Sequence, residues 1–292
     1  MPALALSMLS QNVTALTQFS AQARHVEVYA TVTDQQGRPV TGLTKEDFAV
    51  AEDGLAQPIT VFEAGGFPLA LAVGIDRSFS LSPDELKRAI VGGRQLFEAL
   101  RPTDRATLLA IGSTVETLAP LSADRAPALT ALTRLERWGS TPLYDAALQG
   151  IDAIQSATGR RALVLITDGD DRYSSTTAGD LVLAAKRRDV LVYPIALGRE
   201  RPPVLVQLAA ATGGRSFAAH DERAMAQAVR SIADELRQQY LLGYTPSRSD
   251  PAEQEWRSIR VTVKRPDVRV RARDGYFTRG PAVATPGGAP TY

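Results

Sequence analysis

The chain has 292 residues, of which 44% are hydrophobic and 22% charged, so it is long enough for one large or two ordinary domains with a buried core. Lys and Arg total 33 against 32 Asp and Glu, and this balance gives no reason to expect a nucleic-acid or membrane partner. Cysteine is absent from the sequence, which excludes disulfides, thiolate metal sites and a cysteine nucleophile.

Residues 1–24 have mixed features. Their apolar run is short and has no Lys or Arg before Arg24, unlike a secretory signal, whereas residues 19–23 resemble a signal-peptide cleavage site. We expect a flexible amino terminus, with the remnant of a signal peptide as the alternative. The expected location is accordingly extracytoplasmic (periplasmic or secreted), or cytoplasmic if the amino terminus is as written. No run in the sequence reaches the roughly 18 apolar residues of a transmembrane helix.

Residues 25–33 alternate between apolar and polar side chains, which predicts a half-buried strand. A turn at 34–37 follows, and Thr44 is placed to cap a single helical turn. Residues 48–52 and 59–62 are predicted to form a hairpin with a longer loop. This first segment is too small to bury a core of its own.

The unbroken apolar run at 69–75 is typical of a strand that is covered on both faces of a parallel sheet. Three oxygen-bearing side chains follow it at alternate positions: Asp76, Ser78 and Ser80. The capping-box sequence at 82–85 then predicts a helix over 83–100. The three side chains should therefore lie at the carboxyl end of a buried strand, where open α/β sheets place their ligand sites.

Strands and helices continue to alternate. The patterns predict strands at 106–112, 115–121, 163–167, 190–197 and 215–219, and helices at 126–138, 141–158, 177–188, 204–212 and 221–239. This alternation predicts a doubly wound, mostly parallel sheet with helices on both faces and right-handed crossovers.

From Tyr240 onward the pattern returns to half-exposed strands, at 259–263 and 268–272. Neither terminal strand group can bury its apolar face alone, so we predict that they pair into one discontinuous antiparallel β-sandwich with the α/β block inserted between them. The predicted division is a flexible or signal-derived 1–24, an immunoglobulin-like β-sandwich of 25–65 plus 240–279, an α/β domain over 66–239, and a disordered tail at 280–292.

Two further oxygen-bearing residues occupy comparable positions. Thr141 stands at the start of a predicted helix, and Asp168 directly follows the strand at 163–167. Mg²⁺ takes about six oxygens in a near-octahedral arrangement, so a site on the first loop needs ligands from other loops. In this order, Asp76, Ser78, Ser80, Thr141 and Asp168 resemble the metal-ion-dependent adhesion site (MIDAS) of von Willebrand factor type A domains. The resemblance covers roughly residues 66–235.

The resemblance implies a protein-binding module of the adhesion type that is not an enzyme. It implies Mg²⁺, with Mn²⁺ or Ca²⁺ as alternatives, held by those five residues, with an open coordination position for an Asp or Glu of a partner protein. The flanking segments are similar to those of a bacterial family of secreted proteins that is abundant in acidobacteria. The partner and the oligomeric state are not specified by these patterns.

One departure from the family concerns the residue between the two serines, which is usually small and is Phe79 here. Together with Arg77 and Tyr144, Phe79 is predicted to form the partner-binding rim. Arg77 has two readings: it weakens the cation site by repulsion, or it attracts an anionic partner.

Structural readings compete with each of these assignments. Thr141 is also a good N-cap, and Asp170 and Asp171 read as solvated loop charges. The basic residues Arg260, Lys264, Arg269, Arg271 and Arg273 form either a solvated strand face or a surface for an anionic partner, and the first is favoured. The alternative functions are a metal-dependent hydrolase and an assembly protein whose metal only joins loops. No nucleophile–base pair or histidine stands near the predicted site in sequence to favour the hydrolase.

Overall fold

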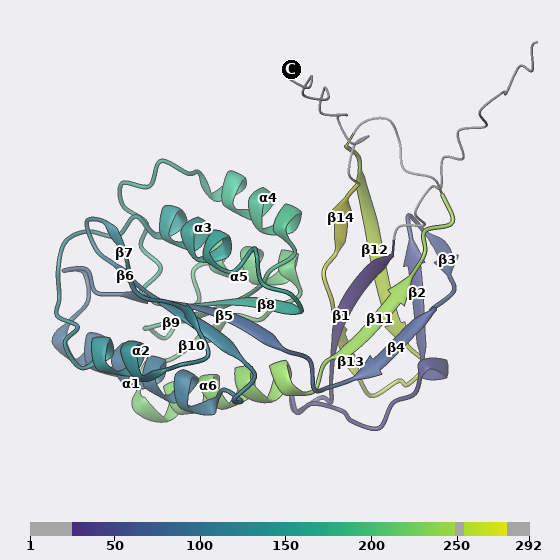
Figure 1. The fold of residues 1–292 in the computed structure, drawn as a ribbon, viewed down its shortest axis with the longest axis horizontal. Coiled ribbons are helices and arrows are strands. Elements are labelled where there is room, and N and C mark those ends of the chain that lie inside the picture. The colour runs from purple at the N-terminus through teal and green to yellow at the C-terminus, as the bar shows by residue number, and fades with distance from the viewer. Residues whose placement is uncertain (1–24, 249–253, 279–292) are drawn as a thin grey trace, which may run out of the picture.

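A computed structural model describes residues 25–248 and 254–278. The predictions of a flexible or signal-derived segment at 1–24 and of a disordered tail at 280–292 lie outside these residues. Within the described ranges, the chain forms one six-stranded sheet flanked by helices and two four-stranded antiparallel sheets (Figure 1). This arrangement confirms the predicted fold class. The exact domain boundaries at 65/66 and 239/240 stay predictions.

The central sheet has the strand order β10-β9-β8-β5-β6-β7. Its strands are β5 (Leu69–Asp76), β6 (Arg105–Ile111), β7 (Val115–Ser122), β8 (Arg160–Thr167), β9 (Leu191–Ala196) and β10 (Phe217–Ala218). All neighbouring pairs are parallel except β6 and β7, which are antiparallel. Strand β7 follows β6 directly along the chain and pairs with it at the edge of the sheet. The two strands can be antiparallel because a hairpin needs no crossover helix.

Six helices cover the two faces of this sheet: α1 (Pro83–Ala99), α2 (Ala126–Leu132), α3 (Leu143–Ala153), α4 (Ala178–Arg188), α5 (Pro203–Thr212) and α6 (Glu222–Arg237). Figure 1 shows α1, α2 and α6 on one face and α3, α4 and α5 on the other. The side chains of β5 alternate accordingly: Leu71 and Val73 join the core under α1 and α6, whereas Ala70 and Ala72 join the core under α3. Burial on both faces explains why the run at 69–75 contains no polar residue.

The direction of the chain changes at the centre of the sheet. After β5 the chain goes to β6 on one side, and after β8 it goes to β9 on the other side. The loops that leave β5 and β8 therefore diverge, and they form the switch point at which open sheets bind ligands. Since β5 is entered from the sandwich side through residues 65–68, this edge of the sheet lies at the end of the molecule away from the sandwich (Figure 1).

The two smaller sheets pack as a sandwich around a core of their own. One sheet has the order β13-β1-β11-β4 and the other β14-β12-β2-β3. Their strands are β1 (Val26–Thr33), β2 (Phe48–Glu52), β3 (Leu55–Gln57), β4 (Val61–Ala64), β11 (Tyr240–Tyr244), β12 (Trp256–Val263), β13 (Arg269–Arg271) and β14 (Gly275–Phe277), with a 3₁₀ turn at Lys45–Asp47. Each sheet combines two strands from the amino-terminal segment with two from the carboxyl-terminal segment, as the discontinuous sandwich requires.

The hairpin predicted from 48–52 and 59–62 is wrong in its second strand. Strand β2 pairs instead with β3, across the tight turn at Asp53 and Gly54. Strand β4 pairs with β11 in the other sheet, so the chain crosses the sandwich between the two strands. The pairing partner of β4 lies nearly 180 residues later in the chain, as the register Phe62 to Leu242 shows, and a local pattern cannot reveal it.

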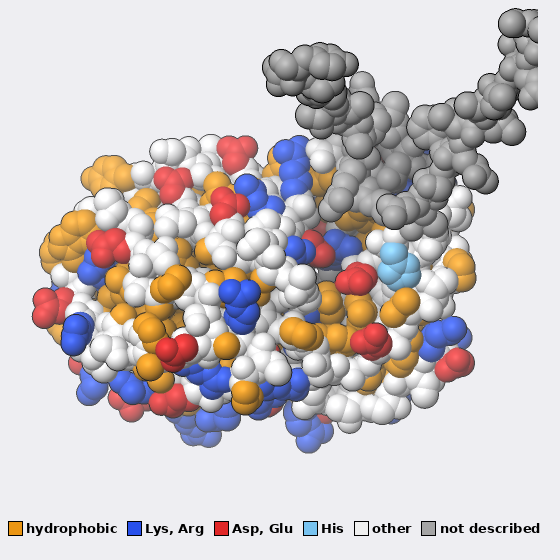
Figure 2. Space-filling model, viewed as in Figure 1, with side chains coloured by type: hydrophobic (Ala, Val, Ile, Leu, Met, Phe, Trp, Pro, Cys, Tyr) orange, Lys and Arg blue, Asp and Glu red, His pale blue; other side chains and the backbone are white. Residues whose placement is uncertain are grey.

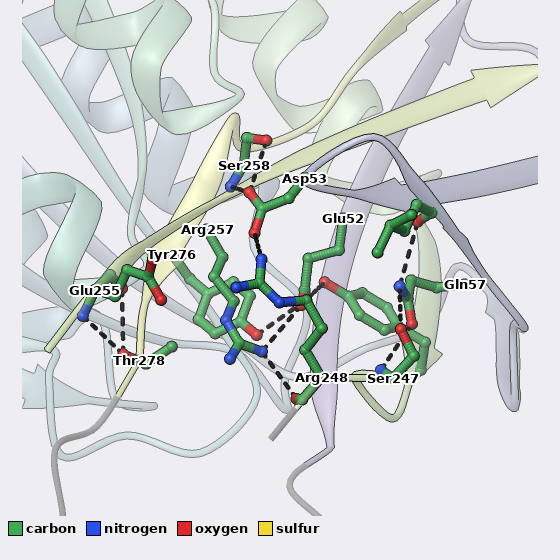
Figure 3. A network of polar contacts seen from close by, with 12 residues as sticks. Glu52, Asp53, Gln57, Ser247, Arg248, Glu255, Arg257, Ser258, Tyr276 and Thr278 are labelled. Carbon is green, nitrogen blue, oxygen red and sulfur yellow. Dashed lines mark hydrogen bonds and ion pairs between the residues drawn. The ribbon is translucent and has the colours of Figure 1, made fainter. Parts of the chain in front are cut away.

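Glu52 joins the two sheets of the sandwich from a fully buried position, 1% exposed. Its carboxylate accepts hydrogen bonds from Tyr244 of β11 at 2.7 Å and from Tyr276 of β14 at 2.9 Å, and it pairs with Arg257 of β12 at 3.1 Å. Figure 3 shows this network and the neighbouring Asp53–Arg248 ion pair. A buried carboxylate needs such partners, because an uncompensated charge in a protein interior is strongly destabilising.

The sandwich and the α/β block meet at buried polar groups. Arg160, at the start of β8, donates to the carbonyl oxygens of Phe67 and Leu236 and to Gln239 Oε1. Burial lowers the pKa of Arg160 to about 10. Gln239 in turn donates to Thr31 Oγ1 of β1 at 3.0 Å. These bonds lie where the chain passes between the two units, so they fix the orientation of one relative to the other.

Two of the arginines on the predicted basic strand face also join the units. Arg271 pairs with the buried Glu235 of α6 at 2.7 Å, and Arg273 pairs with Asp189 at 2.9 Å. The favoured reading of a purely solvated face is therefore wrong for these two residues, although Arg260 and Arg269 are exposed. Elsewhere, acidic and basic side chains are interspersed over the face that Figure 2 shows. Of the helices in the described ranges, none has the length and apolar character needed to span a membrane.

We expect Glu52→Ala to lower the free energy of unfolding by about 3–5 kcal/mol, because it leaves Arg257 buried without its carboxylate partner. Urea unfolding followed by circular dichroism measures this loss. The control is Glu63→Ala, which removes an exposed carboxylate from β4 and should change stability by less than about 0.5 kcal/mol. Equal effects of the two substitutions would contradict the role given to Glu52.

Candidate metal centre

Three segments meet at the carboxyl edge of the sheet and carry the predicted ligands. The loop at 77–82 leaves β5, the loop at 168–177 leaves β8, and the segment at 133–142 connects α2 to α3. The first of these ends in the predicted capping box, which is confirmed: Ser82 caps α1 and exchanges hydrogen bonds with Glu85. Helix α1 thus begins directly behind the loop that carries Ser78 and Ser80, and this fixes the end of that loop.

A continuous chain of oxygens runs from the loop after β5 to the loop after β8. Ser78 Oγ and Ser80 Oγ are 2.8 Å apart, and Ser80 Oγ donates to Asp168 Oδ2 at 2.6 Å. Adjacent oxygens around an octahedral Mg²⁺ are about 2.8–3.0 Å apart, since each lies roughly 2.0–2.1 Å from the ion. Three of the predicted side chains therefore have the donor type and the mutual spacing that fit a small divalent cation.

Asp76 lies beneath this chain of oxygens and is 0% exposed. Its Oδ1 accepts from the backbone N–H of Ser78 at 2.9 Å, and its Oδ2 accepts from Thr167 Oγ1 at 2.8 Å. Burial raises the pKa of Asp76 to about 6, against the lowering effect of the hydrogen bonds from Ser78 and Thr167. Ser80 is exposed and Asp168 half-buried, so the group of side chains opens to solvent on the side away from Asp76.

Thr141 is buried, 1% exposed, and its segment is bonded to the loop after β8. The carbonyl oxygen of Thr141 accepts from Arg172 N at 2.7 Å. The competing reading as an N-cap does not hold, because Pro142 occupies the N-cap position of α3. The free N–H of Tyr144, in the first turn of α3, is satisfied by Asp171 and Ser174 instead. The structure therefore brings Thr141 to the same edge as Asp168 without using it to begin the helix.

Residues 133–142, which follow α2, form a non-helical segment that we call the strap. The sequence predicts that the helix continues to 138, and this part of the prediction is wrong. Helix α2 ends at Leu132, and the chain then runs alongside the loop after β5. Trp138 N donates to Arg77 O at 2.6 Å, and Phe79 N donates to Gly139 O at 2.9 Å. A helix over 133–138 would lose both bonds, so the pairing between distant segments overrides the local helical pattern. The predicted helix at 141–158 is also shorter, Leu143–Ala153.

Gly139 makes the strap possible. It has a φ of +75°, a conformation that side chains disfavour, and an added Cβ would lie 2.3 Å from the backbone nitrogen of Ser113. Ser113 Oγ accepts from Ser140 N at 3.3 Å. The strap is therefore packed against the loop after β6 as well as against the loop after β5.

The predicted rim residues have different environments. Phe79 is 62% exposed, whereas Tyr144 is half-buried beside the start of α3. Arg77 pairs with Glu116 at 2.7 Å, and its guanidinium lies 5.0 Å from the ring centroid of Trp138. Because Glu116 neutralises Arg77, neither strong repulsion of a cation nor direct attraction of an anion is required of this arginine.

Sequence reasoning missed two residues of this region, Thr167 and Glu116, and one contact of a third, Trp138. Thr167 holds Asp76, Glu116 holds Arg77, and Trp138 packs under the guanidinium of Arg77. For Thr167 a signal existed, since a hydroxyl at the last position of a buried apolar strand is next to Asp168. For Glu116 and Trp138 the pairing depends on the strap, which has no local signature. Asp171, read as a solvated charge, accepts a hydrogen bond from the first turn of α3.

The chemistry of the five predicted ligands limits which metals could bind at this edge. No group of three or more His, Cys, Asp or Glu side chains suited to a metal occurs in residues 25–248 and 254–278. The predicted set has two carboxylates and three hydroxyls, which suits Mg²⁺ or Mn²⁺ and not a soft transition metal. His25 and His220 both lie outside the three segments that meet at this edge.

Comparison with known proteins finds a family that part of this chain resembles. Residues 71–170 match the family model of the von Willebrand factor type A domain. This stretch of the chain is similar to a von Willebrand factor type A (VWA) domain. The matched stretch begins inside β5 and ends two residues after Asp168, so it includes all five predicted ligands. No curated protein matches the chain.

The similarity to solved structures covers more of the chain than residues 71–170. A von Willebrand factor type A structure from Catenulispora acidiphila has 15% sequence identity and a TM-score of 0.52, with 78% of this chain and 71% of that chain covered. Proximal thread matrix protein 1 from the mussel byssus has 12% identity and a TM-score of 0.50, with 64% and 51% covered. The manganese-loaded TRAP protein of Plasmodium vivax has 18% identity and a TM-score of 0.48, with 74% and 98% covered. The first two structures, whose TM-scores are 0.50 or higher, share the fold of this chain, and at such low identities they show the fold alone.

We expect Gly139→Ala to lower the free energy of unfolding by about 2–4 kcal/mol, since it combines backbone strain with a clash against backbone atoms. The matched control is Gly54→Ala, because Gly54 has a φ of +80° and no atom within 4 Å of an added Cβ; it should cost only about 1 kcal/mol. Urea unfolding gives both values, and hydrogen exchange should rise at residues 77–80 in the Gly139 variant alone. Similar losses in the two variants would show that the strap is not packed as described.

Proposed function

We propose that the chain is a metal-dependent protein-binding module, in which Asp76, Ser78, Ser80, Thr141 and Asp168 hold Mg²⁺ or Mn²⁺ at the open edge of the VWA sheet. The observation that carries this proposal is the hydrogen-bonded series from Ser78 through Ser80 to Asp168, with oxygen–oxygen distances of 2.8 and 2.6 Å. These side chains come from two loops whose strands are neighbours in the sheet, so the fold itself maintains their spacing.

Each residue has a distinct task in this proposal. Ser78 and Ser80 supply hydroxyl oxygens from the loop after β5, and Thr141 supplies one from the segment before α3. Asp168 supplies negative charge at the exposed side of the site, while Asp76 supplies it from below and orients Ser78 through the backbone N–H of that residue. Thr167 holds Asp76 in place. The side chains of these loops thus keep a fixed set of oxygen donors ready, with little reorganisation on binding.

When bound, the cation would offer a coordination position to a carboxylate of another protein, and such a charge-assisted contact is strong and directional. We therefore propose a partner that presents an Asp or Glu, in an extracytoplasmic setting. The match to the VWA family supports a binding module over an enzyme, because VWA domains are usually not catalytic. The hydrolase and the loop-joining metal have no observation of their own in their favour.

We expect Mg²⁺ to stabilise the protein by about 2–3 kcal/mol at 100 times its dissociation constant. Asp76→Asn should abolish this stabilisation and change the stability of the metal-free protein by less than about 2 kcal/mol, because it removes the cost of a buried charge but also one of the two hydrogen bonds that the carboxylate accepts. Thermal unfolding with Mg²⁺ and with EDTA measures both effects. Asp84→Asn, at an exposed position of α1, is the control that keeps the Mg²⁺ shift. A full Mg²⁺ shift in the Asp76 variant would contradict the proposed site.

A second pair of variants tests Thr141. Thr141→Val keeps the shape of the side chain but removes the hydroxyl, so we expect the affinity for Mn²⁺ measured by calorimetry to fall at least about tenfold, within the range found for lost ligand-shell groups. Thr141→Ser keeps the hydroxyl and should lose less than about threefold in Mn²⁺ affinity. If both variants bind Mn²⁺ as well as the original protein, Thr141 is not a ligand and the proposed five-residue set is wrong in this member.

A further inference from the structure

Exposed aromatic side chains lie on the three segments that meet at the candidate metal centre. Six large hydrophobic side chains are exposed among the residues that the structure describes, and three of them lie on the segments that carry the predicted ligands. These three are Phe79, 62% exposed, Trp138, 40% exposed, and Tyr173, 84% exposed. We refer to them as the aromatic rim. Each belongs to a different one of the three segments that meet at this edge.

Trp138 is held in a fixed position despite its exposure. One face of its ring is covered by the guanidinium of Arg77, which Glu116 holds in turn. Gly112 lies against the ring, because an added Cβ there would be 2.6 Å from a ring carbon. The backbone N–H of Trp138 is bonded to Arg77 O. An exposed ring that is already ordered loses little conformational freedom when a partner packs on it.

Phe79 is ordered in a similar way. Arg137 donates to Phe79 O at 3.1 Å, and its guanidinium lies 5.8 Å from the centroid of the Phe79 ring. The N–H of Phe79 is bonded to Gly139 O. Both backbone groups of Phe79 are therefore occupied, and the ring extends outward between Ser78 and Ser80, where the VWA resemblance predicts a small residue.

Tyr173 adds an independent observation, which is backbone strain. Its φ is +70°, a conformation that costs a non-glycine residue about 1–2 kcal/mol. The neighbouring Arg172 N is bonded to Thr141 O, which ties this turn to the segment before α3. A bulky aromatic residue is kept in a strained turn here with its side chain in solvent, so packing within the chain does not account for it.

Two of the three arginines beside the aromatic rim are paired with carboxylates, and the third, Arg137, donates to Phe79 O. Arg77 pairs with Glu116, and Arg172 pairs with Asp170 at 2.9 Å. The rim therefore offers mainly apolar ring faces, with Arg137 at the edge of Phe79 as a weak contact for an anion, and the main attraction for a carboxylate is left to the candidate metal centre. This combination is complementary to an acidic side chain that has apolar neighbours.

We infer that the aromatic rim selects the partner: the segment it accepts carries an Asp or Glu flanked directly by aromatic or large aliphatic residues. The inference rests on the proposed function, since the acidic side chain is the one that the metal centre would receive. It adds what the metal centre alone cannot provide, namely discrimination between acidic segments that differ only in their neighbouring residues.

Two synthetic peptides of equal charge test the inference: acetyl-Lys-Gly-Leu-Trp-Glu-Leu-Gly-Lys-amide and acetyl-Lys-Gly-Ser-Asn-Glu-Ser-Gly-Lys-amide, each with the same fluorescent label. Binding to the full chain is measured by fluorescence anisotropy in Mg²⁺ and in EDTA. We expect the apolar-flanked peptide to bind at least about tenfold more tightly in Mg²⁺, and both peptides to lose binding in EDTA. A third peptide, with Gln in place of Glu in the apolar-flanked sequence, should not bind.

Variants of the rim separate its role from that of the metal centre. Phe79→Ser installs a small residue, and Tyr173→Asn installs a residue that tolerates positive φ, so neither is expected to unfold the chain. The double variant should keep its affinity for Mg²⁺ by calorimetry, while its preference for the apolar-flanked peptide falls to within about threefold. Leu55→Ser, at a 52% exposed position of β3 in the sandwich, should leave the preference unchanged.

The possible failures point to different conclusions. Equal affinities for the two Glu peptides in Mg²⁺ would overturn the inference and leave the proposed function intact. A preference that persists in the double variant would also overturn it. If Mg²⁺ binds but neither Glu peptide does, or if the Gln peptide binds as well as its Glu counterpart, the proposed recognition of a carboxylate is wrong, and the selection of acidic segments by the rim is wrong with it.

Discussion

The buried carboxylate of Asp76 is the interaction on which the functional edge of the domain depends. It accepts one hydrogen bond from Thr167 at the end of β8 and another from the backbone of Ser78. Since β5 and β8 are neighbours from which the chain leaves in opposite directions, these bonds join two loops that would otherwise diverge. A buried anion is costly without such partners, so the carboxylate and the loop geometry stabilise each other.

Around this carboxylate the remaining loops are joined by backbone bonds rather than by a hydrophobic core. The strap at 133–142 pairs with the loop after β5, and Thr141 pairs with the loop after β8. Backbone pairing fixes positions without covering the surface, so hydroxyl and carboxylate oxygens stay accessible at the centre of the edge. The same segments carry exposed aromatic rings, and arginines of this region contact two of those rings. A few precisely placed polar groups among apolar side chains fix the orientation of a ligand and provide specificity.

The sandwich is held at the end of the α/β block opposite the candidate metal centre. Arg160 and the Arg271–Glu235 pair join it to the amino end of the sheet and to α6, at buried positions where a broken contact is costly. The carboxyl edge of the sheet consequently faces away from the sandwich (Figure 1). The candidate metal centre and the aromatic rim therefore lie clear of the second unit of the chain.

The sequence by itself determined those features that have local patterns. The buried run of β5, the capping box at Ser82, the alternation of strands and helices, and the placement of Asp76, Ser78, Ser80 and Asp168 at strand ends follow from periodicity and from the chemistry of single residues. Only the tertiary structure decided which segments meet. The early end of α2, the pairing of β4 with β11, the bond from Thr167 to Asp76 and the contact of Arg77 with Trp138 each depend on residues far apart in the chain. Hydrogen-bond partners and packing neighbours at such distances outweigh local propensity, and the sequence pattern of one segment contains no information about its partner.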